Sequence, residues 1–282
     1  MLSRYSLFTS FRSIVLAVLL LTTYYLPLTI FSGCATNPVT GQQELRLFSD
    51  DQEITLGLQT KAAIIKQYGE YKDPGLKQYI TDMGMKLASV SERKYLPYNF
   101  TILDTDMINA FAAPGGCIFV TRGILKAMDN ESELAAVLGH EIGHVSSRHS
   151  MQAMEKQYGY EIMFKVTEML SKKDLSSLKQ YSDTLAGLIF LGYGRQNEFQ
   201  ADNCGVRYET AAGYNGYGAV TFFGKLEKLE GSKPTQLELL FRSHPATGDR
   251  IYKVREYLAS IGYQAPTTPI MDSYKGRVAA LP

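Results

Sequence analysis

Apolar residues recur at helical spacing through most of the chain beyond position 48. A first predicted helix starts after Ser49, which can cap it, and runs to about Gln67. A second helix opens at Asp73-Pro74, because proline is favoured in the first turn of a helix. Its predicted buried face carries four apolar residues, Leu76, Ile80, Met83 and Leu87.

Between positions 98 and 121 the pattern changes to that of short strands. Residues 98–103 alternate as a strand does, and residues 109–113 and 118–121 form two more short runs. Pro114-Gly115-Gly116 separates the last two runs and predicts a hairpin turn. Helical spacing then returns for most of the remaining length. We therefore predict an α+β, mainly helical fold, in one domain over residues 49–263 with a small sheet.

The first 33 residues predict a lipoprotein signal peptide rather than part of the fold. Arg4 and Arg12 precede an apolar stretch over 13–31, and two small residues follow it. Cys34 comes next, and its position resembles that of the cysteine that carries the lipid anchor in bacterial lipoproteins. An uncleaved membrane anchor is the alternative, because the apolar stretch approaches the length that spans a bilayer. Both interpretations place the rest of the chain outside the cytoplasm.

Two segments flank the predicted domain. Residues 34–48 form an extended N-terminal lead, and residues 264–282, with three prolines and little periodicity, form a surface tail. No other stretch of 18 apolar residues exists, so we expect the rest of the chain to be soluble or peripheral. Cys34 is followed by Ala35, and in this the chain resembles bacterial lipoproteins that are sorted to the outer membrane. We therefore expect the protein to lie on the periplasmic side of the cell envelope, anchored to the outer membrane.

Composition and cysteine content narrow the function classes. The net charge is +1 and no block of Lys or Arg occurs, which excludes a basic nucleic-acid-binding surface. Besides Cys34, the chain has Cys117 and Cys204, and an oxidising compartment would permit a disulfide between them. Two small buried thiols are the favoured alternative, because two cysteines do not make a disulfide framework.

The strongest chemical signal lies in the helix predicted over residues 130–148. Asn130 can cap it, with Glu133 as the partner in a capping box. Within it stands the sequence His140-Glu141-Ile142-Gly143-His144, which contains two of the four histidines in the chain. Histidines at positions i and i+4 share one helix face and can converge on one cation. A chance match to this motif in a chain of this size is on the order of 1%.

The same spacing predicts that Glu141 acts on a water rather than binding the metal. Its side chain is turned about 100° from His140, so it can miss the metal and still reach a water beside it. Zinc lowers the pKa of such a water, and a neighbouring carboxylate can take its proton. Gly139 and Gly143 lie in the middle of this helix at a cost of about 1 kcal/mol each. That cost indicates that the helix is approached closely or packed tightly at these positions.

Two histidines are too few ligands for a catalytic zinc. The longer motif with a third histidine is excluded, because Ser147 and Ser150 occupy its glycine and histidine positions. We expect His149 to be a surface or structural residue, turned away from the site by helical geometry. A better candidate is the sequence Asn197 to Asp202. There Glu198 could bind the metal, while Asp202 accepts a hydrogen bond from a ligand histidine.

With these motifs the chain resembles the membrane-associated gluzincin metallopeptidases, which include the heat-shock peptidase HtpX and the CAAX prenyl endopeptidase. The likeness is greatest to their bacterial periplasmic lipoprotein branch. The matching segments are CATNPVTG at 34–41, INAFAAPGG at 108–116, IFVTRGIL at 118–125, ELAAVLGHEIGHVSSRH at 133–149, NEFQAD at 197–202 and SHPATGDRI at 243–251.

The resemblance implies a zincin-like endopeptidase with one zinc ion per chain. His140, His144 and Glu198 would be its ligands and Glu141 its general base. It also implies that the strand formed by Asn109, Ala110, Phe111 and Ala112 is an exposed edge to which a substrate backbone can add. The absence of the HtpX membrane domain favours unfolded or misassembled envelope proteins as substrates. A zinc-stabilised chaperone or assembly factor with silenced proteolysis is the alternative.

His244 keeps three possible roles at this stage. It could donate a hydrogen bond to the oxyanion formed on the scissile carbonyl. It could instead occupy the open metal position in a resting state, or it could be structural. The resemblance places its segment at the active site, and Arg250 could fix that segment by pairing with an acid.

Overall fold

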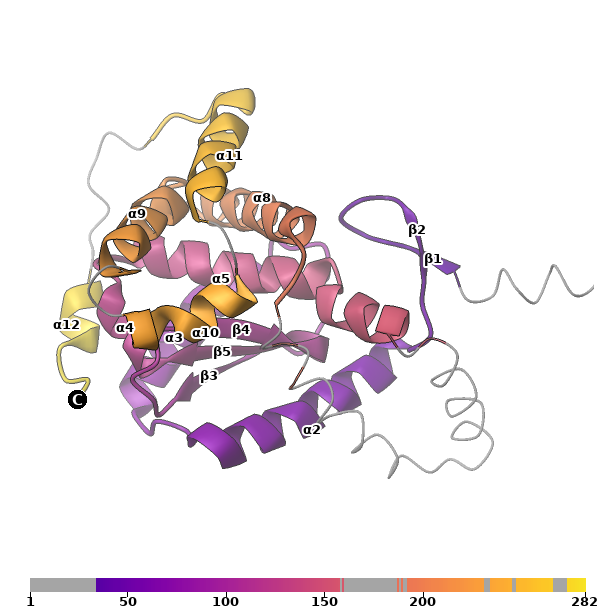
Figure 1. Ribbon diagram of the computed structural model, residues 1–282, viewed down its shortest axis with the longest axis horizontal. Coiled ribbons are helices and arrows are strands. Elements are labelled where there is room, and N and C mark those ends of the chain that lie inside the picture. Colours follow the sequence, from indigo (N-terminus) through magenta and orange to yellow (C-terminus); the bar gives the residue numbers. More distant parts are fainter. Residues whose placement is uncertain are drawn as a thin grey trace, which may run out of the picture.

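In a computed structural model of the chain we describe residues 34–157, 192–230, 234–244, 247–265 and 273–282, together with residues 159, 187 and 189. The predicted signal peptide over 1–33 lies outside these described residues. Helices dominate the described parts, and a small sheet lies against them (Figure 1). The predicted mainly helical α+β class is confirmed.

The central sheet has three strands. They are β3 (Asn99–Leu103), β4 (Ala110–Ala113) and β5 (Cys117–Thr121), in the order β3-β5-β4. β5 pairs parallel to β3 and antiparallel to β4. A short 3-10 turn, η2 (Pro114–Gly116), joins β4 to β5. Its two glycines have φ values of 68° and 91°, which only glycine adopts readily, so the predicted turn is confirmed.

The helices begin close to where the capping residues predicted them. Ser49 caps α2 (Asp50–Tyr68) and Asp73 caps α3 (Pro74–Ala88). The metal-motif helix is α5 (Glu131–Ser146), capped by Asn130. Further helices are α4 (Arg122–Ala127), α8 (Arg195–Ala211), α9 (Gly218–Glu230), α10 (Pro234–Ser243), α11 (Thr247–Ser260) and α12 (Tyr274–Val278).

The cap of α5 departs in one detail from the predicted capping box. The Asn130 side chain accepts a hydrogen bond from the Glu133 amide at 3.0 Å, as expected. The Glu133 carboxylate, however, accepts from the amide of Asp129, one residue before the cap, and from the Lys225 ammonium. Glu133 therefore ties the start of α5 to α9 rather than closing the box on Asn130.

Both flanking segments are more ordered than the sequence pattern predicted. Residues 34–48 contain a two-stranded antiparallel hairpin, β1 (Cys34–Thr36) and β2 (Gln43–Leu45), instead of a simple extended lead. At the other end, Tyr274 of α12 is fully buried and its hydroxyl donates to the Leu125 carbonyl at 2.5 Å. Residues 273–282 therefore pack on the domain, unlike the predicted surface tail. Among the described helices, none is both long and apolar enough to cross a bilayer.

α5 lies between the sheet and the later helices. It contacts β4 and β5 on one side and α8 and α9 on the other, while α2 runs along the opposite side of the sheet (Figure 1). The C-terminal end of α5 is fixed by a buried arginine, since Arg93 donates to both the Val145 carbonyl and the Glu53 carboxylate of α2. Breaking a buried ion pair of this kind costs about 3–5 kcal/mol.

Three glycines allow α5 and α8 to cross with almost no gap. A Cβ atom on Gly143 would lie 2.9 Å from the Ala201 carbonyl oxygen, and one on Gly205 would lie 2.9 Å from the His140 nitrogen. A Cβ atom on Gly139 would lie 3.1 Å from the Gly205 backbone. The mid-helix glycines of the metal motif are therefore explained by close packing against α8.

This crossing makes a stability prediction. Gly143→Ala should lower the free energy of unfolding by about 1–3 kcal/mol, because the added methyl group overpacks the contact with α8. Gly224→Ala is the matched control, because no atom lies within 4 Å of a Cβ there. It should raise stability by up to about 1 kcal/mol through helix propensity. Urea unfolding with a chelator present measures both, and equal stabilities would contradict the need for close approach.

Candidate metal centre

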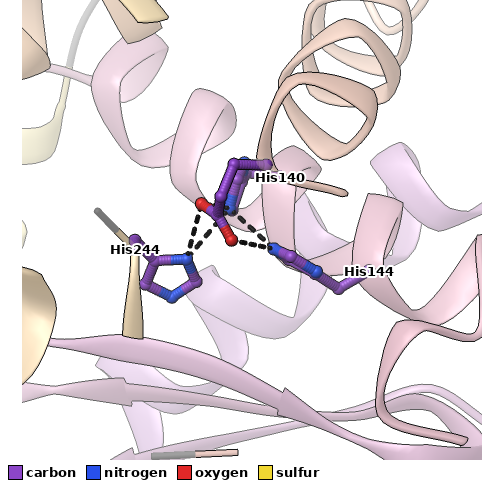
Figure 2. Close-up of side chains that lie close together, drawn as sticks. His140, His144 and His244 are labelled. Atoms are coloured by element: carbon purple, nitrogen blue, oxygen red, sulfur yellow. Dashed lines mark hydrogen bonds and ion pairs between the residues drawn. The ribbon is translucent and has the colours of Figure 1, made fainter. Parts of the chain in front are cut away.

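Four buried side chains converge where α5, α8 and the end of α10 meet. His140 and His144 come from α5, Glu198 comes from the first turn of α8, and His244 follows α10. One ligand atom from each lies within 4.8 Å of all the others. Figure 2 shows the three labelled histidine rings directed at one carboxylate, and the Glu198 oxygens lie 3.6 Å from His140, 3.5 Å from His144 and 3.1 Å from His244.

These distances fit a tetrahedral cation site. Zinc bonds of about 2.0–2.1 Å imply ligand atoms about 3.4 Å apart. The Nε2 atom of His140 lies 2.9 Å from His144 Nε2 and 3.3 Å from His244 Nδ1. Within the described part of the chain, Glu198 Oε1 is buried without a hydrogen-bond partner. A buried oxygen without a donor is costly unless a cation satisfies it, so this donor set suits zinc.

The outer nitrogen of His140 is held by a carboxylate, as the sequence predicted for Asp202. His140 Nδ1 lies 2.8 Å from Asp202 Oδ1. Arg250 in turn donates to both Asp202 oxygens, at 2.6 and 2.7 Å. Burial would raise the pKa of Asp202, but the Arg250 guanidinium lowers it well below its usual range. The ionised Asp202 therefore accepts the Nδ1 proton of His140 and leaves its Nε2 lone pair facing the cluster.

Arg250 also contacts the carboxylate of Glu198, a candidate metal ligand. Its Nη1 atom lies 3.1 Å from Glu198 Oε2, and its side chain is buried. One guanidinium therefore fixes Glu198 and Asp202 together, a larger role than the sequence indicated for this residue.

His149 lies in a different place from the one that helical geometry predicted. α5 ends at Ser146, and Arg148 takes a left-handed backbone conformation with φ of 57°. This turn brings the His149 ring back against the site, fully buried, with its Nδ1 atom 2.8 Å from His144 Nδ1. The surface alternative for His149 is wrong, because the helix does not continue through that position.

The partner of His149 defines which nitrogen carries each proton. His149 Nε2 lies 3.0 Å from the Gln200 side-chain oxygen, to which it must donate. Its Nδ1 is then an acceptor for the Nδ1 proton of His144, and the His144 Nε2 lone pair faces the cluster. Burial lowers the pKa of His149 to about 4, consistent with a neutral ring. The two histidines of the motif therefore have different outer partners, a carboxylate and a neutral imidazole.

Glu141 borders the cluster without joining it. Its Oε1 atom lies 3.6 Å from His244 Nε2, and Oε2 is buried without a hydrogen-bond partner among the described residues. Burial raises the pKa of Glu141, although the charges on His244 and His140 oppose this effect. A buried carboxylate with a raised pKa and a free oxygen is suited to accept and return a proton.

His244 bridges the cluster and the sheet. Its Nδ1 atom faces Glu198 and His140, while its Nε2 atom lies 3.2 Å from the Ala110 carbonyl oxygen. Because carbonyl and carboxylate oxygens accept, both ring nitrogens are placed to donate here. Burial lowers the pKa of His244, but the Glu198 carboxylate raises it to about 8. A cation in the cluster would take the place of the Nδ1 proton, so the position of Nδ1 among the four converging atoms favours the fourth-ligand role among the three left open by the sequence.

The predicted edge strand has the expected topology but not the expected exposure. β4 lies at the edge of the three-stranded sheet. The carbonyl of Asn109, which precedes β4, accepts a hydrogen bond from the amide of Thr121 at the end of β5. In an antiparallel pair only alternate residues bond to the partner strand, so the backbone polar groups of Ala110 and Ala112 point away from β5. All four strand residues are buried, and His244 already contacts the Ala110 carbonyl.

Sequence reasoning missed the contributions of His149, Gln200 and Tyr193. The Tyr193 ring stacks on His144 with centroids 4.5 Å apart. The one signal in the sequence that could have pointed to Gln200 was its position inside the segment that holds Glu198 and Asp202.

Cys117 and Cys204, whose pairing the sequence left open, are both buried free thiols.

Comparison with known proteins agrees with this geometry. The sequence profile of peptidase family M48 matches residues 74–258, which contain all four clustered side chains and Glu141. The chain belongs to peptidase family M48. The resemblance to gluzincin metallopeptidases is thereby confirmed at the level of the family.

Three similar proteins are themselves named as proteases. The beta-barrel assembly-enhancing protease of Escherichia coli (strain K12) is 32% identical over 65% of this chain, and the match covers 39% of that protein. Metalloprotease YcaL of the same organism is 31% identical over 58% of the chain and 63% of its own length. The mitochondrial metalloendopeptidase OMA1 of Schizosaccharomyces pombe is 26% identical over 84% of this chain and 72% of its own length. The chain thus spans well under half of the first of these relatives.

The hydrogen-bond chain behind His144 predicts an effect on zinc affinity. Gln200→Leu should weaken zinc binding about 10–100-fold, because His149 loses the acceptor that fixes its tautomer. Gln200→Glu keeps an acceptor oxygen at the same position and should retain the affinity. Competition with a chromogenic chelator measures both constants. Equal weakening by the two variants would show that side-chain packing, not the acceptor, matters at this position.

Proposed function

We propose that this protein is a zinc-dependent endopeptidase that cleaves unfolded or misassembled proteins of the bacterial cell envelope. The observation that carries the peptidase part is the free oxygen of Glu141 beside four converging ligand atoms. A structural zinc site usually has four protein ligands, many of them cysteines, and no open coordination position. This site instead has a carboxylate next to the cluster that is free to act on a water. Family membership supports the same assignment.

The roles of the residues in the reaction follow from their positions. His140, His144 and Glu198 would hold the metal. Zinc would polarise the scissile carbonyl and lower the pKa of the attacking water. Glu141 would take the proton of that water and deliver it to the leaving amine, for which its raised pKa is suitable. Asp202, with Arg250 behind it, would keep His140 in its binding tautomer.

We propose that β4 is the strand on which a substrate backbone pairs. The outward polar groups of Ala110 and Ala112 would form the new ladder, next to the reacting groups. The Ala110 carbonyl already accepts a hydrogen bond from His244 in this structure, so a substrate strand would have to displace His244 from that carbonyl. Loss of that hydrogen bond would free His244 to move from the fourth ligand position, so substrate pairing and activation would be coupled.

The compartment and the partners are part of the same proposal. A lipid on Cys34 would anchor the chain to the envelope, on the periplasmic side and in the outer membrane. The name of the beta-barrel assembly-enhancing relatives supports envelope proteins as substrates. We propose no nucleic-acid partner, in keeping with the net charge of +1.

Cleavage should depend on the carboxylate of Glu141. Glu141→Gln should bind zinc as the original chain does but lose cleavage of casein by at least about 10²–10⁴-fold, because the proton acceptor is gone. Metal analysis and a casein digest measure the two properties. Glu238→Gln, on α10 and away from the cluster, is the control substitution. Casein cleavage that survives Glu141→Gln unchanged would rule out the proposed base.

A second candidate function is favoured by the position of His244. As a fourth ligand it would silence the metal, and the protein could then act as a zinc-stabilised chaperone or assembly factor. The Glu141→Gln variant separates the two functions. Full rescue of a deletion phenotype by that variant would support the chaperone, whereas failure to rescue would support the protease.

The role of His244 can be measured spectroscopically. In the cobalt-substituted protein, His244→Ala should change the visible absorption spectrum, because one nitrogen donor is lost from the ligand set. Glu141→Gln should leave the spectrum unchanged, since Glu141 lies outside that set. If His244→Ala leaves the spectrum unchanged and lowers kcat about 10²–10³-fold, His244 is an oxyanion donor instead.

A further inference from the structure

The N-terminal hairpin, β1 and β2 with the turn between them, is bonded to the turn that ends α5 (Figure 1). Asn37 follows β1 and is buried, and its Nδ2 atom donates to the Ser147 carbonyl oxygen at 3.3 Å. The Asn37 side-chain oxygen accepts from the amides of Val39 and Thr40, which fixes Nδ2 as the donating atom. The segment next to the predicted lipid anchor therefore contacts the end of the metal-motif helix.

A carboxylate on the hairpin strengthens this contact. Glu44 of β2 accepts from the Asn37 side-chain amide at 2.6 Å and from the Gln152 side-chain amide at 2.8 Å. Gln152 also donates to the Ser147 carbonyl oxygen, at 2.7 Å. Glu44 therefore orients both side-chain amides that hold the Ser147 carbonyl.

The next residue along the chain has a backbone conformation that needs such support. Arg148 has a φ of 57°, in the left-handed region that a residue with a Cβ atom adopts only at a cost in free energy. Its buried guanidinium lies 3.2 Å from Glu53 and 3.2 Å from Glu155. Glu155 also accepts from the Leu47 amide, at 3.0 Å, so the residues between the hairpin and α2 reach the same turn. The turn is thus held both at its carbonyl and at its charged side chain.

This turn places His149 behind the metal motif. Its Nδ1 atom lies 2.8 Å from His144 Nδ1, and its Nε2 atom lies 3.0 Å from the Gln200 side-chain oxygen. Hydrogen bonds weaken steeply with distance and angle, so a small rotation of the turn would break this chain of contacts. His144 would then lose the acceptor that keeps its Nε2 lone pair facing the cluster.

We propose that the N-terminal hairpin is a positioning element of the metal centre: by holding the Ser147 carbonyl, it keeps His149 behind His144 and so raises the affinity for zinc. This inference rests on the zinc site of the proposed function and adds to it a control from the N-terminus. The hairpin begins at Cys34, the residue that we propose to carry the lipid. A hairpin detached from the turn would leave the zinc more weakly bound.

Asn37→Asp tests the contact while keeping the hairpin turn. The new carboxylate retains an oxygen for the two amides of that turn, but it has no proton for the Ser147 carbonyl and it faces the charge of Glu44. The zinc affinity of the full chain, measured by competition with a chromogenic chelator, should fall about tenfold, the lower limit of the effect usual for partners behind a metal ligand.

A substitution on the same hairpin provides the matched control. Gln43 is exposed, and its side chain donates to the Thr36 hydroxyl within the hairpin. Gln43→Ala should therefore leave the zinc affinity unchanged. Glu44→Ala removes the acceptor that orients both amides and should act as Asn37→Asp does, so it gives the answer if circular dichroism shows that Asn37→Asp does not fold.

The tautomer of His149 is a readout that a general loss of stability would not change. The chain has four histidines, so nuclear magnetic resonance of isotope-labelled imidazole nitrogens in the zinc-loaded protein gives few signals. In the unsubstituted chain His149 should carry its proton on Nε2 alone. In Asn37→Asp its signals should show a mixture of tautomers, as they should in Gln200→Leu.

The outcomes separate this inference from the function on which it rests. If the unsubstituted chain binds no zinc, the proposed function fails, and this inference fails with it. If that chain binds zinc and the folded Asn37→Asp and Glu44→Ala variants keep either its affinity or its single His149 tautomer, only this inference fails. It fails equally if Gln43→Ala has the same effects as Asn37→Asp.

Discussion

The close crossing of α5 and α8 is the contact on which the rest of the site depends. Each helix alone carries an incomplete ligand set, two histidines on one and a carboxylate on the other. The glycines at 139, 143 and 205 remove the side chains that would hold the two backbones apart. The cost of about 1 kcal/mol for a glycine within a helix is therefore offset by a geometry that larger residues would exclude.

Around this crossing the buried polar groups form chains with defined proton positions. Arg250 fixes Asp202, which fixes His140, while Gln200 fixes His149, which fixes His144. Each of these two hydrogen-bond chains ends at an imidazole whose Nε2 lone pair faces the cluster of His140, His144, Glu198 and His244. An ionised carboxylate makes its imidazole more basic than a neutral ring does, so the two histidines would donate unequally to a cation.

His244 contacts both the general-base candidate and the edge strand. Its Nε2 atom lies 3.6 Å from the Glu141 carboxylate and 3.2 Å from the Ala110 carbonyl oxygen. In the proposed function, β4 would align the substrate backbone and His244 would give way to it. A substrate that pairs with the strand would therefore act on His244 through its contact with Ala110.

The sequence by itself determined what depends on neighbours along the chain. The caps Ser49, Asp73 and Asn130, the turn at 114–116 and the i, i+4 histidines could all be predicted, because local hydrogen bonds and helix periodicity fix them. Only the tertiary structure decided the place of His149, the contacts of His244 and the packing of Tyr274. Each depends on partners that are remote in sequence or on a helix end. His149 faces the site because α5 stops at Ser146, and His244 meets Ala110 across more than a hundred residues. Periodicity within one segment contains no information about such contacts.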